Sequence, residues 1–351
     1  MTTSVIADTL MSAMGPRLPQ LRVTVNSRCQ RACFYCRPSG ESVSVRGRRE
    51  LALDDLLVVG RAFVGLGITE VKLTGGDPAL WGPVVRAVPA LKAIGFERVE
   101  VISRHPRIGE LAPDLAAGGV DLVNLSVDTL DPALHREITG VDDLESVLAA
   151  VRRSAAAAPS CKVNVVVMSG VNDGEVDDLI GFCADAGVST VKLLDVIHDL
   201  DEGRESFGGR LARLRASTLQ ELYVPLGEIC ERLAARAVRR GVRHQGGLGH
   251  PMTSLTMPEG VEVLIKDHSV GAWYGDVCRS CRHYPCHDAL MAIRLTSDLR
   301  IQLCLLREDT AVSVAHLLDD PPALRHALAR AMATYSSAEF REEGAAWLVT
   351  S

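Results

Sequence analysis

Residues Leu21–Cys36 read "LRVTVNSRCQRACFYC" and join a strand pattern to a group of thiols. Polar and apolar side chains alternate in the first part, "LRVTVN", which is typical of a β-strand. Cys29, Cys33 and Cys36 follow within eight positions, and no fourth cysteine stands beside them. The stretch therefore predicts a loop with thiol chemistry directly after the first strand.

The order of strand and helix then recurs along the chain. Strands are readable in "TEVKLTGGDP", "RVEVIS", "VDLVNLSVD", "CKVNVVVM" and "STVKLLDVI", and the segments between them have helical spacing. Strict alternation of strands and helices predicts a parallel sheet with right-handed crossovers. Because six strands are too few for a closed eight-stranded barrel, we predict an α/β fold with a partial (β/α)6 TIM-like barrel over residues 15–215.

Residues 216–351 predict a C-terminal α+β extension that caps the barrel mouth. A helical pattern at 218–241 leads into hairpin patterns at 252–266 and 294–305, with cysteines between the two hairpins. The alanine-rich segment 321–336 predicts a last helix that packs on the outside.

Polar side chains share one face of four predicted strands, because side chains alternate with a period of two. These residues are Arg22, Thr24 and Asn26; Lys72 and Thr74; Asn124, Ser126 and Asp128; and Lys162 and Asn164. Helices should cover the opposite, apolar face, so the polar face lines the lumen, where a closed barrel would pack branched aliphatic side chains. The pattern predicts a polar ligand there. The alternative is that each basic residue is salt-bridged across the barrel.

Charge and hydropathy argue against several classes of partner. The formal net charge of −6 and the pI near 5.9 disfavour a nucleic-acid-binding surface, although a local basic pocket remains compatible with them. No apolar run approaches the roughly 18 residues of a membrane span, and the first residues lack a secretory signal pattern. We therefore expect a cytoplasmic protein without nucleic-acid or membrane partners.

Ten cysteines in a reducing compartment favour metal ligands, reactive thiols or core residues over disulfides. Cys161, Cys183 and Cys230 lie singly in apolar segments and are expected in the core. Structural zinc is nearly always closed by four ligands, and the histidine nearest to the first three cysteines, His105, is far along the chain. A four-iron cluster held by three cysteines instead leaves one iron open to a small molecule.

The stretches "VKLTGGDPAL", "VNLSVDTLDPALHREITG", "CKVNVVVMSGVNDGEVDDL" and "RLTSDLRIQLCL" add to the opening motif, from about Leu21 to Leu305. Together they resemble the radical S-adenosylmethionine (SAM) superfamily, and within it the MoaA family of molybdenum-cofactor GTP cyclases. The resemblance implies that Cys29, Cys33 and Cys36 hold a [4Fe–4S] cluster whose open iron chelates SAM. One electron would then cleave SAM to methionine and a 5′-deoxyadenosyl radical, which abstracts hydrogen from the substrate.

The same resemblance implies contacts for the cofactor and the substrate. The implied SAM contacts are Tyr35, Gly75, Gly76, Asp77, Ser126 and Ile197. The implied substrate contacts are Arg22, Lys72, Ser103, Lys162 and Arg294. A buried cation is costly without a partner, so an anionic ligand would satisfy the basic residues among them. An external reductant such as flavodoxin or ferredoxin is also implied.

Near the other end of the chain, the resemblance implies a second [4Fe–4S] cluster. The expected ligands are Cys278, Cys281, Cys286 and Cys304. Cys286 lies in a segment that is longer than in the family, "RHYPCHDALM", and a fourth thiolate there could close the cluster. The alternative is a zinc site in which His283 or His287 joins Cys278, Cys281 and Cys286.

Departures from the family argue against GTP as the substrate. Ala292 stands where the cyclases have an arginine, "SRHPR" replaces a Thr-Asn-Gly sequence, and "EEGAAWLVTS" lacks a Gly-Gly tail. We therefore predict a radical SAM enzyme that acts on another polar, anionic small molecule, such as a nucleotide or a sugar phosphate. Two alternatives are a radical SAM enzyme that modifies peptides and a non-catalytic iron–sulfur or zinc scaffold.

Overall fold

The computed structural model describes residues 19–33, 35–36, 50–196, 220–244, 251–266, 272–282, 284, 292–305 and 307–341. Six consecutive strands form the centre of its large sheet. They are β1 (Gln20–Thr24), β2 (Glu70–Thr74), β3 (Arg98–Ser103), β4 (Leu122–Ser126), β5 (Cys161–Val166) and β6 (Thr190–Leu194). Each strand runs parallel to the next. The predicted α/β class with a large parallel sheet is thus confirmed.

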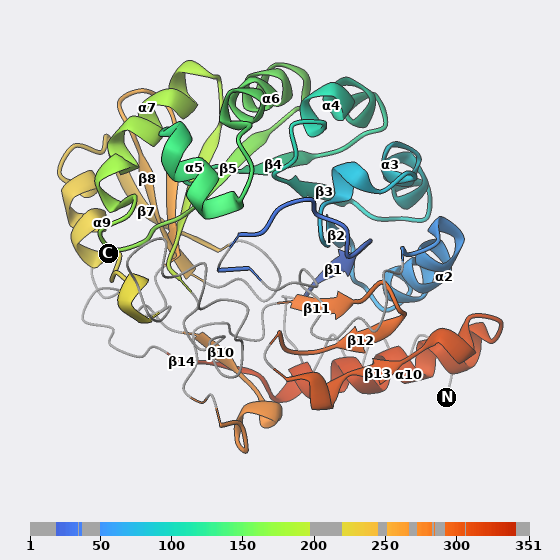
Figure 1. Ribbon diagram of the computed structural model, residues 1–351. Coiled ribbons are helices and arrows are strands. Elements are labelled where there is room, and N and C mark those ends of the chain that lie inside the picture. The colour runs from blue at the N-terminus through green and yellow to red at the C-terminus, as the bar shows by residue number, and fades with distance from the viewer. Residues whose placement is uncertain are drawn as a thin grey trace.

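Helices connect these strands and lie on one side of the sheet. They are α2 (Leu53–Val64), α3 (Val84–Ala93), α4 (Ile108–Ala117), α5 (Pro132–Thr139), α6 (Leu144–Ala157) and α7 (Val176–Asp185). In Figure 1, α2, α3, α4, α6 and α7 follow one another in an arc around the outside of the strands, and α5 lies inward of that arc. Local sequence sets their ends: Asp131 caps α5 by accepting hydrogen bonds from the amides of Ala133 (2.7 Å) and Leu134 (3.1 Å).

The apolar face of the sheet packs against these helices. Leu21 and Val23 of β1 are fully buried in the same core as Leu56 and Phe63 of α2. Burial of each such side chain contributes roughly 1.5–3 kcal/mol, so the core fixes which face of each strand meets the helices. The polar side chains occupy the other face, because neighbouring residues of a strand point in opposite directions.

Later strands extend both edges of the same sheet. On one side lie β9 (Glu262–Lys266), β8 (Pro251–Thr256) and β7 (Arg239–His244), and on the other β11 (Ala292–Leu295), β12 (Arg300–Gln302) and β13 (Val312–Ser313). The full order is β13-β12-β11-β1-β2-β3-β4-β5-β6-β9-β8-β7. β9 is parallel to β6 and β11 is parallel to β1. The predicted hairpins are present as the antiparallel pairs β8–β9 and β11–β12.

The helix predicted over residues 218–241 is wrong. Within the described part, this region contains a short 3-10 helix (Gln220–Leu222), the helix α9 (Gly227–Ala234) and the strand β7. Pro225 explains the first break, because proline lacks an N–H and disfavours a helical conformation in the residue before it. The second break follows from pairing, since β7 bonds to β8 along its whole length.

The remaining elements lie at the outside of the molecule. The last helix, α10 (Pro321–Ala333), packs against α2, as expected for segment 321–336 (Figure 1). A small antiparallel pair joins β10 (Ala272–Tyr274) to β14 (Glu339–Arg341). The predicted domain boundary at 215/216 falls outside the described residues. In the part of the chain that the structure describes, no helix is both long and apolar enough to cross a membrane.

Candidate active site

The cysteine loop, residues 27–33 and 35–36, follows β1 at the carboxyl-terminal edge of the parallel strands. The amide of Cys36 donates to the carbonyl of Cys33 (3.1 Å), so a tight turn brings these two residues together. Burial, the carboxylate of Asp77 and the two neighbouring thiols raise the pKa of Cys29 to about 12. The three predicted ligands therefore lie close enough to influence one another's ionisation.

The donor set of this loop suits an iron–sulfur cluster. Among the described residues, no group of three or more His, Cys, Asp or Glu side chains is arranged around a single metal ion. A four-iron cluster makes a different demand, because each of its thiolates binds a different iron. Thiolates are also the ligands that such clusters require, whereas calcium and magnesium prefer oxygen. Cys29, Cys33 and Cys36 therefore fit three-cysteine ligation of a cluster.

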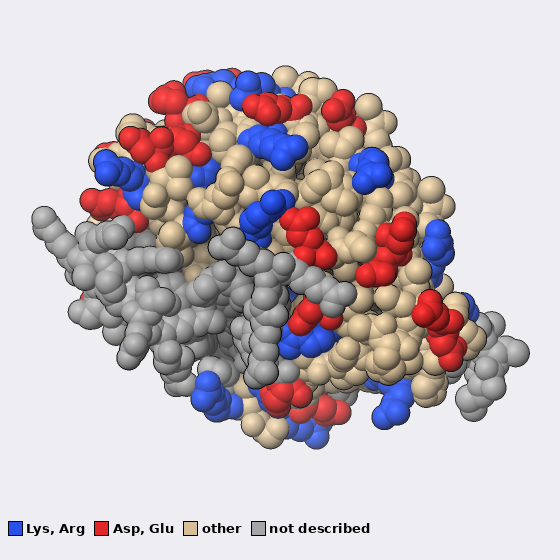
Figure 2. Space-filling view, turned by 45° about the vertical axis from the view of Figure 1, so that its right-hand side comes forward, with Lys and Arg blue, Asp and Glu red and all other residues tan. Residues whose placement is uncertain are grey.

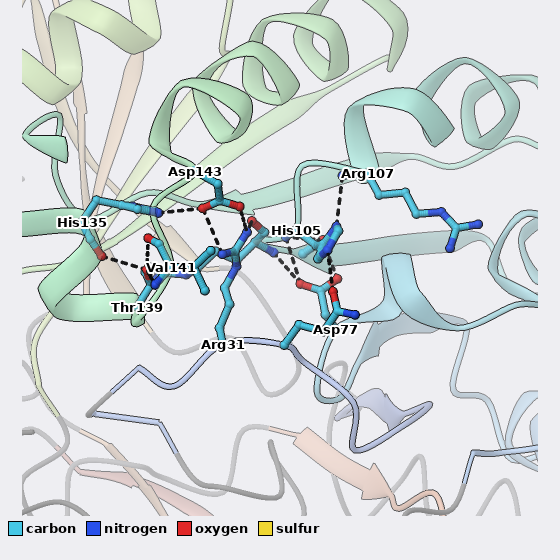
Figure 3. Close-up of polar contacts among 11 residues, drawn as sticks. Arg31, Asp77, His105, Arg107, His135, Thr139, Val141 and Asp143 are labelled. Atoms are coloured by element: carbon cyan, nitrogen blue, oxygen red, sulfur yellow. Dashed lines mark hydrogen bonds and ion pairs between the residues drawn. The ribbon is translucent and has the colours of Figure 1, made fainter. Parts of the chain in front are cut away.

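The loop is anchored to the segment that joins α5 to α6 (Figure 3). The guanidinium of Arg31 makes two bonds to the carboxylate of Asp143, at 3.1 and 2.7 Å. The amide of Ala32 donates to the carbonyl of Thr139 (2.8 Å), and His135 Nε2 lies 3.1 Å from Asp143 Oδ1. Burial opposes ionisation of Asp143, but Arg31 and His135 hold its pKa below the usual value.

A pair of glycines lies directly against the start of the loop. The amide of Gly76 donates to the carbonyl of Asn26 (2.7 Å), and the amide of Asp77 donates to that of Arg28 (2.7 Å). A Cβ on Gly76 would stand 2.4 Å from the carbonyl oxygen of Arg28, and one on Gly75 would stand 2.6 Å from that of Asn26. The close approach of the chain's own cysteine loop therefore requires glycine at both positions.

Both carboxylate oxygens of Asp77 are bonded within the protein. Oδ1 accepts hydrogen bonds from the amide of Ala79 (3.0 Å) and the hydroxyl of Ser103 (2.6 Å). Oδ2 accepts them from the amides of Arg104 (2.8 Å) and His105 (3.0 Å), and His105 is drawn beside Asp77 in Figure 3. Asp77 thus fixes the turn after β3 and sets the position of the Ser103 hydroxyl.

Arg104 and Asp128 surround the aromatic residue of the cysteine loop. Arg104 Nη1 lies 2.7 Å from Asp128 Oδ2. The phenol of Tyr35 donates to the same carboxylate and accepts a bond from Arg104. Burial raises the pKa of Cys33, and the positive charge of Arg104 opposes that shift. A buried cation, which the sequence analysis did not single out, therefore lies beside one of the predicted cluster ligands.

Two predicted contacts stand at the ends of neighbouring strands. Ser103 ends β3 and is buried, whereas Ser126 ends β4 and is partly exposed. Both lie at the edge from which the cysteine loop extends, because the carboxyl ends of parallel strands meet at one edge of a sheet. Ile197, predicted at the end of the sixth strand, lies outside the described residues.

Charged side chains line up across the polar face on neighbouring strands. Arg294 of β11 is the register partner of Arg22 of β1. Arg22 is in turn the partner of Lys72 of β2, and Lys72 is the partner of Glu100 of β3. We call these four residues the charged row. The structure thus brings together Arg22, Lys72 and Arg294, three of the predicted substrate contacts.

Glu100 binds two of the predicted substrate contacts. Its Oε2 lies 3.0 Å from Lys72 Nζ, and its Oε1 lies 3.1 Å from Lys162 Nζ. Burial opposes ionisation of Glu100, but Lys162 and Lys72 hold its pKa well below the usual value. Glu100 is therefore already a partner for the two lysines for which an anionic ligand was expected. The alternative, a salt bridge across the sheet, is confirmed for both.

Two further lysines extend the polar face. Lys192 of β6 and Lys266 of β9 form no ion pair or side-chain hydrogen bond with another described residue. Burial lowers the pKa of Lys192 well below its usual value, and the nearby charges of Lys162, Lys266, Lys72 and Arg22 add to the effect. Positive charge thus exceeds what Glu100 neutralises.

The C-terminal cysteines lie beside a second tight turn. The amide of Cys281 donates to the carbonyl of Cys278 (3.0 Å), just as in the first loop. Arg307 Nη1 donates to the carbonyl of Val277 (2.6 Å), and the amide of Arg307 donates to that of Cys304 (3.4 Å). Arg307 therefore ties the segment of the first two cysteines to that of the third. Outside the described residues lie Cys286, His283 and His287.

Comparisons with known proteins agree with this geometry. Residues 23–183 match the radical SAM superfamily. A probable GTP 3′,8-cyclase of Thermococcus kodakarensis is 29% identical over 86% of this chain and 90% of its own length. The GTP 3′,8-cyclase of Geobacter sulfurreducens is 29% identical over 92% of this chain and 91% of its own length. The match and these relatives support an enzyme that is similar to the radical SAM superfamily.

A solved structure supports the fold of this chain. The crystal structure of Streptococcus suis SuiB bound to precursor peptide SuiA matches with a TM-score of 0.57 at 13% identity. The match covers 86% of this chain but 63% of that one, so this chain spans less than two thirds of the SuiB chain. At this identity the likeness concerns the fold alone.

The surface and the site differ in how charge is distributed. Figure 2 shows acidic and basic side chains interspersed over the visible helical face, without a continuous basic patch on that face.

The sequence analysis did not single out four charged residues of the site, which are Glu100, Lys192, Lys266 and Arg104. The period-two pattern could have found the first, because Glu100 alternates with buried Val99 and Val101 in "RVEVIS".

Proposed function

We propose that this protein is a radical SAM enzyme that cleaves SAM reductively and abstracts hydrogen from a polar, anionic small molecule, such as a nucleotide or sugar phosphate. The observation that carries the proposal is the charged row with Lys192 and Lys266 beside it. Lys192 and Lys266 have no carboxylate partner among the described residues, and an anion would stabilise cations on this face. These cations favour a small anionic substrate over a peptide.

We further propose that the sheet curves into a partial barrel around the substrate. The electrostatic influence of Arg22 on Lys192 supports this, because it acts between β1 and β6. In a flat sheet those strands would stand about 24 Å apart, at about 4.8 Å per strand. The interaction energy of two charges falls in inverse proportion to their separation, so it would be weak at that distance. Curvature would bring the polar side chains of both strands to one cavity.

The cysteine loop would hold a [4Fe–4S] cluster through Cys29, Cys33 and Cys36. When bound, that cluster supplies an electron to SAM and an open iron for its chelation. The protein's own groups would orient the cosubstrate: Asp77 holds the Ser103 hydroxyl in place, and Ser126 stands at the end of the adjacent strand. An external reductant such as a flavodoxin or ferredoxin would deliver the electron.

A second [4Fe–4S] cluster is proposed at Cys278, Cys281 and Cys304, with Cys286 as a candidate fourth ligand. Its support is the repeated turn, since Cys278–Cys281 closes with the same backbone bond as Cys33–Cys36, at 3.0 and 3.1 Å. Arg307 would place a positive charge beside these thiolates. The relatives are named for a reaction on GTP, but Ala292 and the Glu100 carboxylate support a different anionic substrate here.

The test is formation of 5′-deoxyadenosine from SAM by reduced, iron-reconstituted protein. We expect product from the wild-type chain and none above background from Cys36→Ala. Cys183→Ala is the matched control, because Cys183 is a core cysteine buried in α7. Metal analysis of the same samples should find iron and no zinc. A wild-type protein that takes up iron but yields no 5′-deoxyadenosine would refute the proposed activity.

A further inference from the structure

Glu100 occupies the middle of the cation set in a fixed position. Its Oε1 accepts hydrogen bonds from Lys162 Nζ (3.1 Å) and Asn124 Nδ2 (3.0 Å), and its Oε2 forms an ion pair with Lys72 Nζ (3.0 Å). Donors from β2, β4 and β5 thus hold a carboxylate that is itself on β3. The residue is 3% exposed, so water does not share in these bonds to any large extent.

This arrangement divides the cations into two groups. Lys72 and Lys162 already share one carboxylate. Lys192 and Lys266 have no carboxylate partner among the described residues. An incoming anion gains most from the second group, since its interaction with the first must compete with Glu100.

We propose that Glu100 is a specificity-determining residue, which makes the site select a substrate with a single phosphate or carboxylate group over a polyphosphate. A single anionic group needs few cations, and Lys192 and Lys266 stand two register positions apart on neighbouring strands. A polyphosphate needs several cations along its length, so it must also reach Lys72 and Lys162, where the fixed carboxylate repels it. This inference rests on the proposed function of the site and names its substrate class.

Equilibrium binding of two simple probes tests the inference without turnover. Inorganic phosphate and tripolyphosphate are titrated by calorimetry into the full chain at one pH and ionic strength. We expect the wild-type chain to bind tripolyphosphate no more tightly than phosphate. Glu100→Gln should bind tripolyphosphate at least tenfold more tightly than the wild type and change phosphate affinity less than threefold. Glu97→Gln is the charge-matched control, because it removes an exposed carboxylate just before β3.

Glu100→Gln leaves Lys72 and Lys162 without their carboxylate and could fail to fold for that reason. A second variant therefore tests the inference independently. Lys162→Met removes one of those lysines and keeps Glu100, so it should weaken tripolyphosphate further while phosphate changes little. Equal effects on both probes, tighter tripolyphosphate binding by the wild type, or no binding of either probe would overturn the inference. Because 5′-deoxyadenosine formation is measured separately, failure of the proposed activity remains distinguishable.

Discussion

Arg31 in the cysteine loop and Asp143 beside α6 form a two-pronged ion pair across 112 residues of sequence, with distances of 2.7 and 3.1 Å. The side chain of Arg31 is 2% exposed, whereas that of Asp143 is 21% exposed. A planar guanidinium bound at two points resists rotation better than a single contact would. The pair therefore fixes the loop between the first and second of its cysteines.

Removal of the acidic partner should loosen the cysteine loop. Asp143→Ala leaves a buried arginine without its carboxylate, which typically costs about 3 kcal/mol. We expect a lower thermal midpoint, lower iron uptake and slower 5′-deoxyadenosine formation. Asp142→Ala is the control, since Asp142 is adjacent and exposed. Equal iron uptake by both variants would show that the ion pair does not hold the loop.

A methyl group on Gly76 should displace the cysteine loop. The added Cβ would stand 2.4 Å from the carbonyl oxygen of Arg28, a contact that the backbone can relieve only by moving. Overpacking typically costs 1–3 kcal/mol, which corresponds to about a tenfold or larger loss of the docked loop. Gly76→Ala should therefore lose about tenfold in cluster loading, measured as iron per chain. Gly82→Ala should load normally, because nothing lies within 4 Å of its Cβ.

Anion binding should weaken as the pH rises from 7 to 9. Burial lowers the pKa of Lys72 to about 8; the Glu100 carboxylate opposes this shift, and the nearby Lys162 and Arg22 add to it. An anion binds the protonated amine, so affinity is full below that pKa and declines as pH rises through it. An alkane disulfonate keeps both charges over this range and, like a polyphosphate, must also reach Lys72, so its affinity should fall up to about tenfold by pH 9.

Lys72→Arg isolates this residue in the pH experiment. A guanidinium stays protonated at pH 9, so the variant should show a shallower decline than the wild type. An identical decline in both proteins would assign the pH dependence to another group, with Lys192 the first candidate because its pKa is also lowered.

Local pattern was enough to predict the strands, the polar face and the thiol groups. Leu21 and Val23 alternate with Arg22 in sequence, and the structure separates them onto opposite faces for that reason. The missed helix boundary at Pro225 was also readable, since proline inside a helical pattern marks a break. Fold class therefore follows from properties of short segments.

Partners of the buried charges could not be predicted in the same way. Lys162 and Glu100 are 62 residues apart, and they meet because β5 and β3 send side chains to the same face from positions two strands apart. Arg31 finds Asp143 only after α5 and α6 have packed. Such contacts depend on how the strands and helices are arranged in three dimensions, and the residue pattern of a short segment does not specify that arrangement.

Loss of a C-terminal cysteine should unload the second cluster and leave the first cluster loaded. Cys304 is buried two residues after β12 ends, whereas the cysteine loop follows β1 near the other end of the sequence. Loss of one thiolate ligand should unload the second cluster, since each iron relies on its own cysteine. We expect Cys304→Ala to bind about half the iron of the wild type and still cleave SAM. Cys230→Ala, which alters a buried cysteine of α9, is the matched control. Unchanged iron content in Cys304→Ala would exclude Cys304 as a ligand, because an auxiliary cluster cannot keep full occupancy at a site that has lost an essential thiolate.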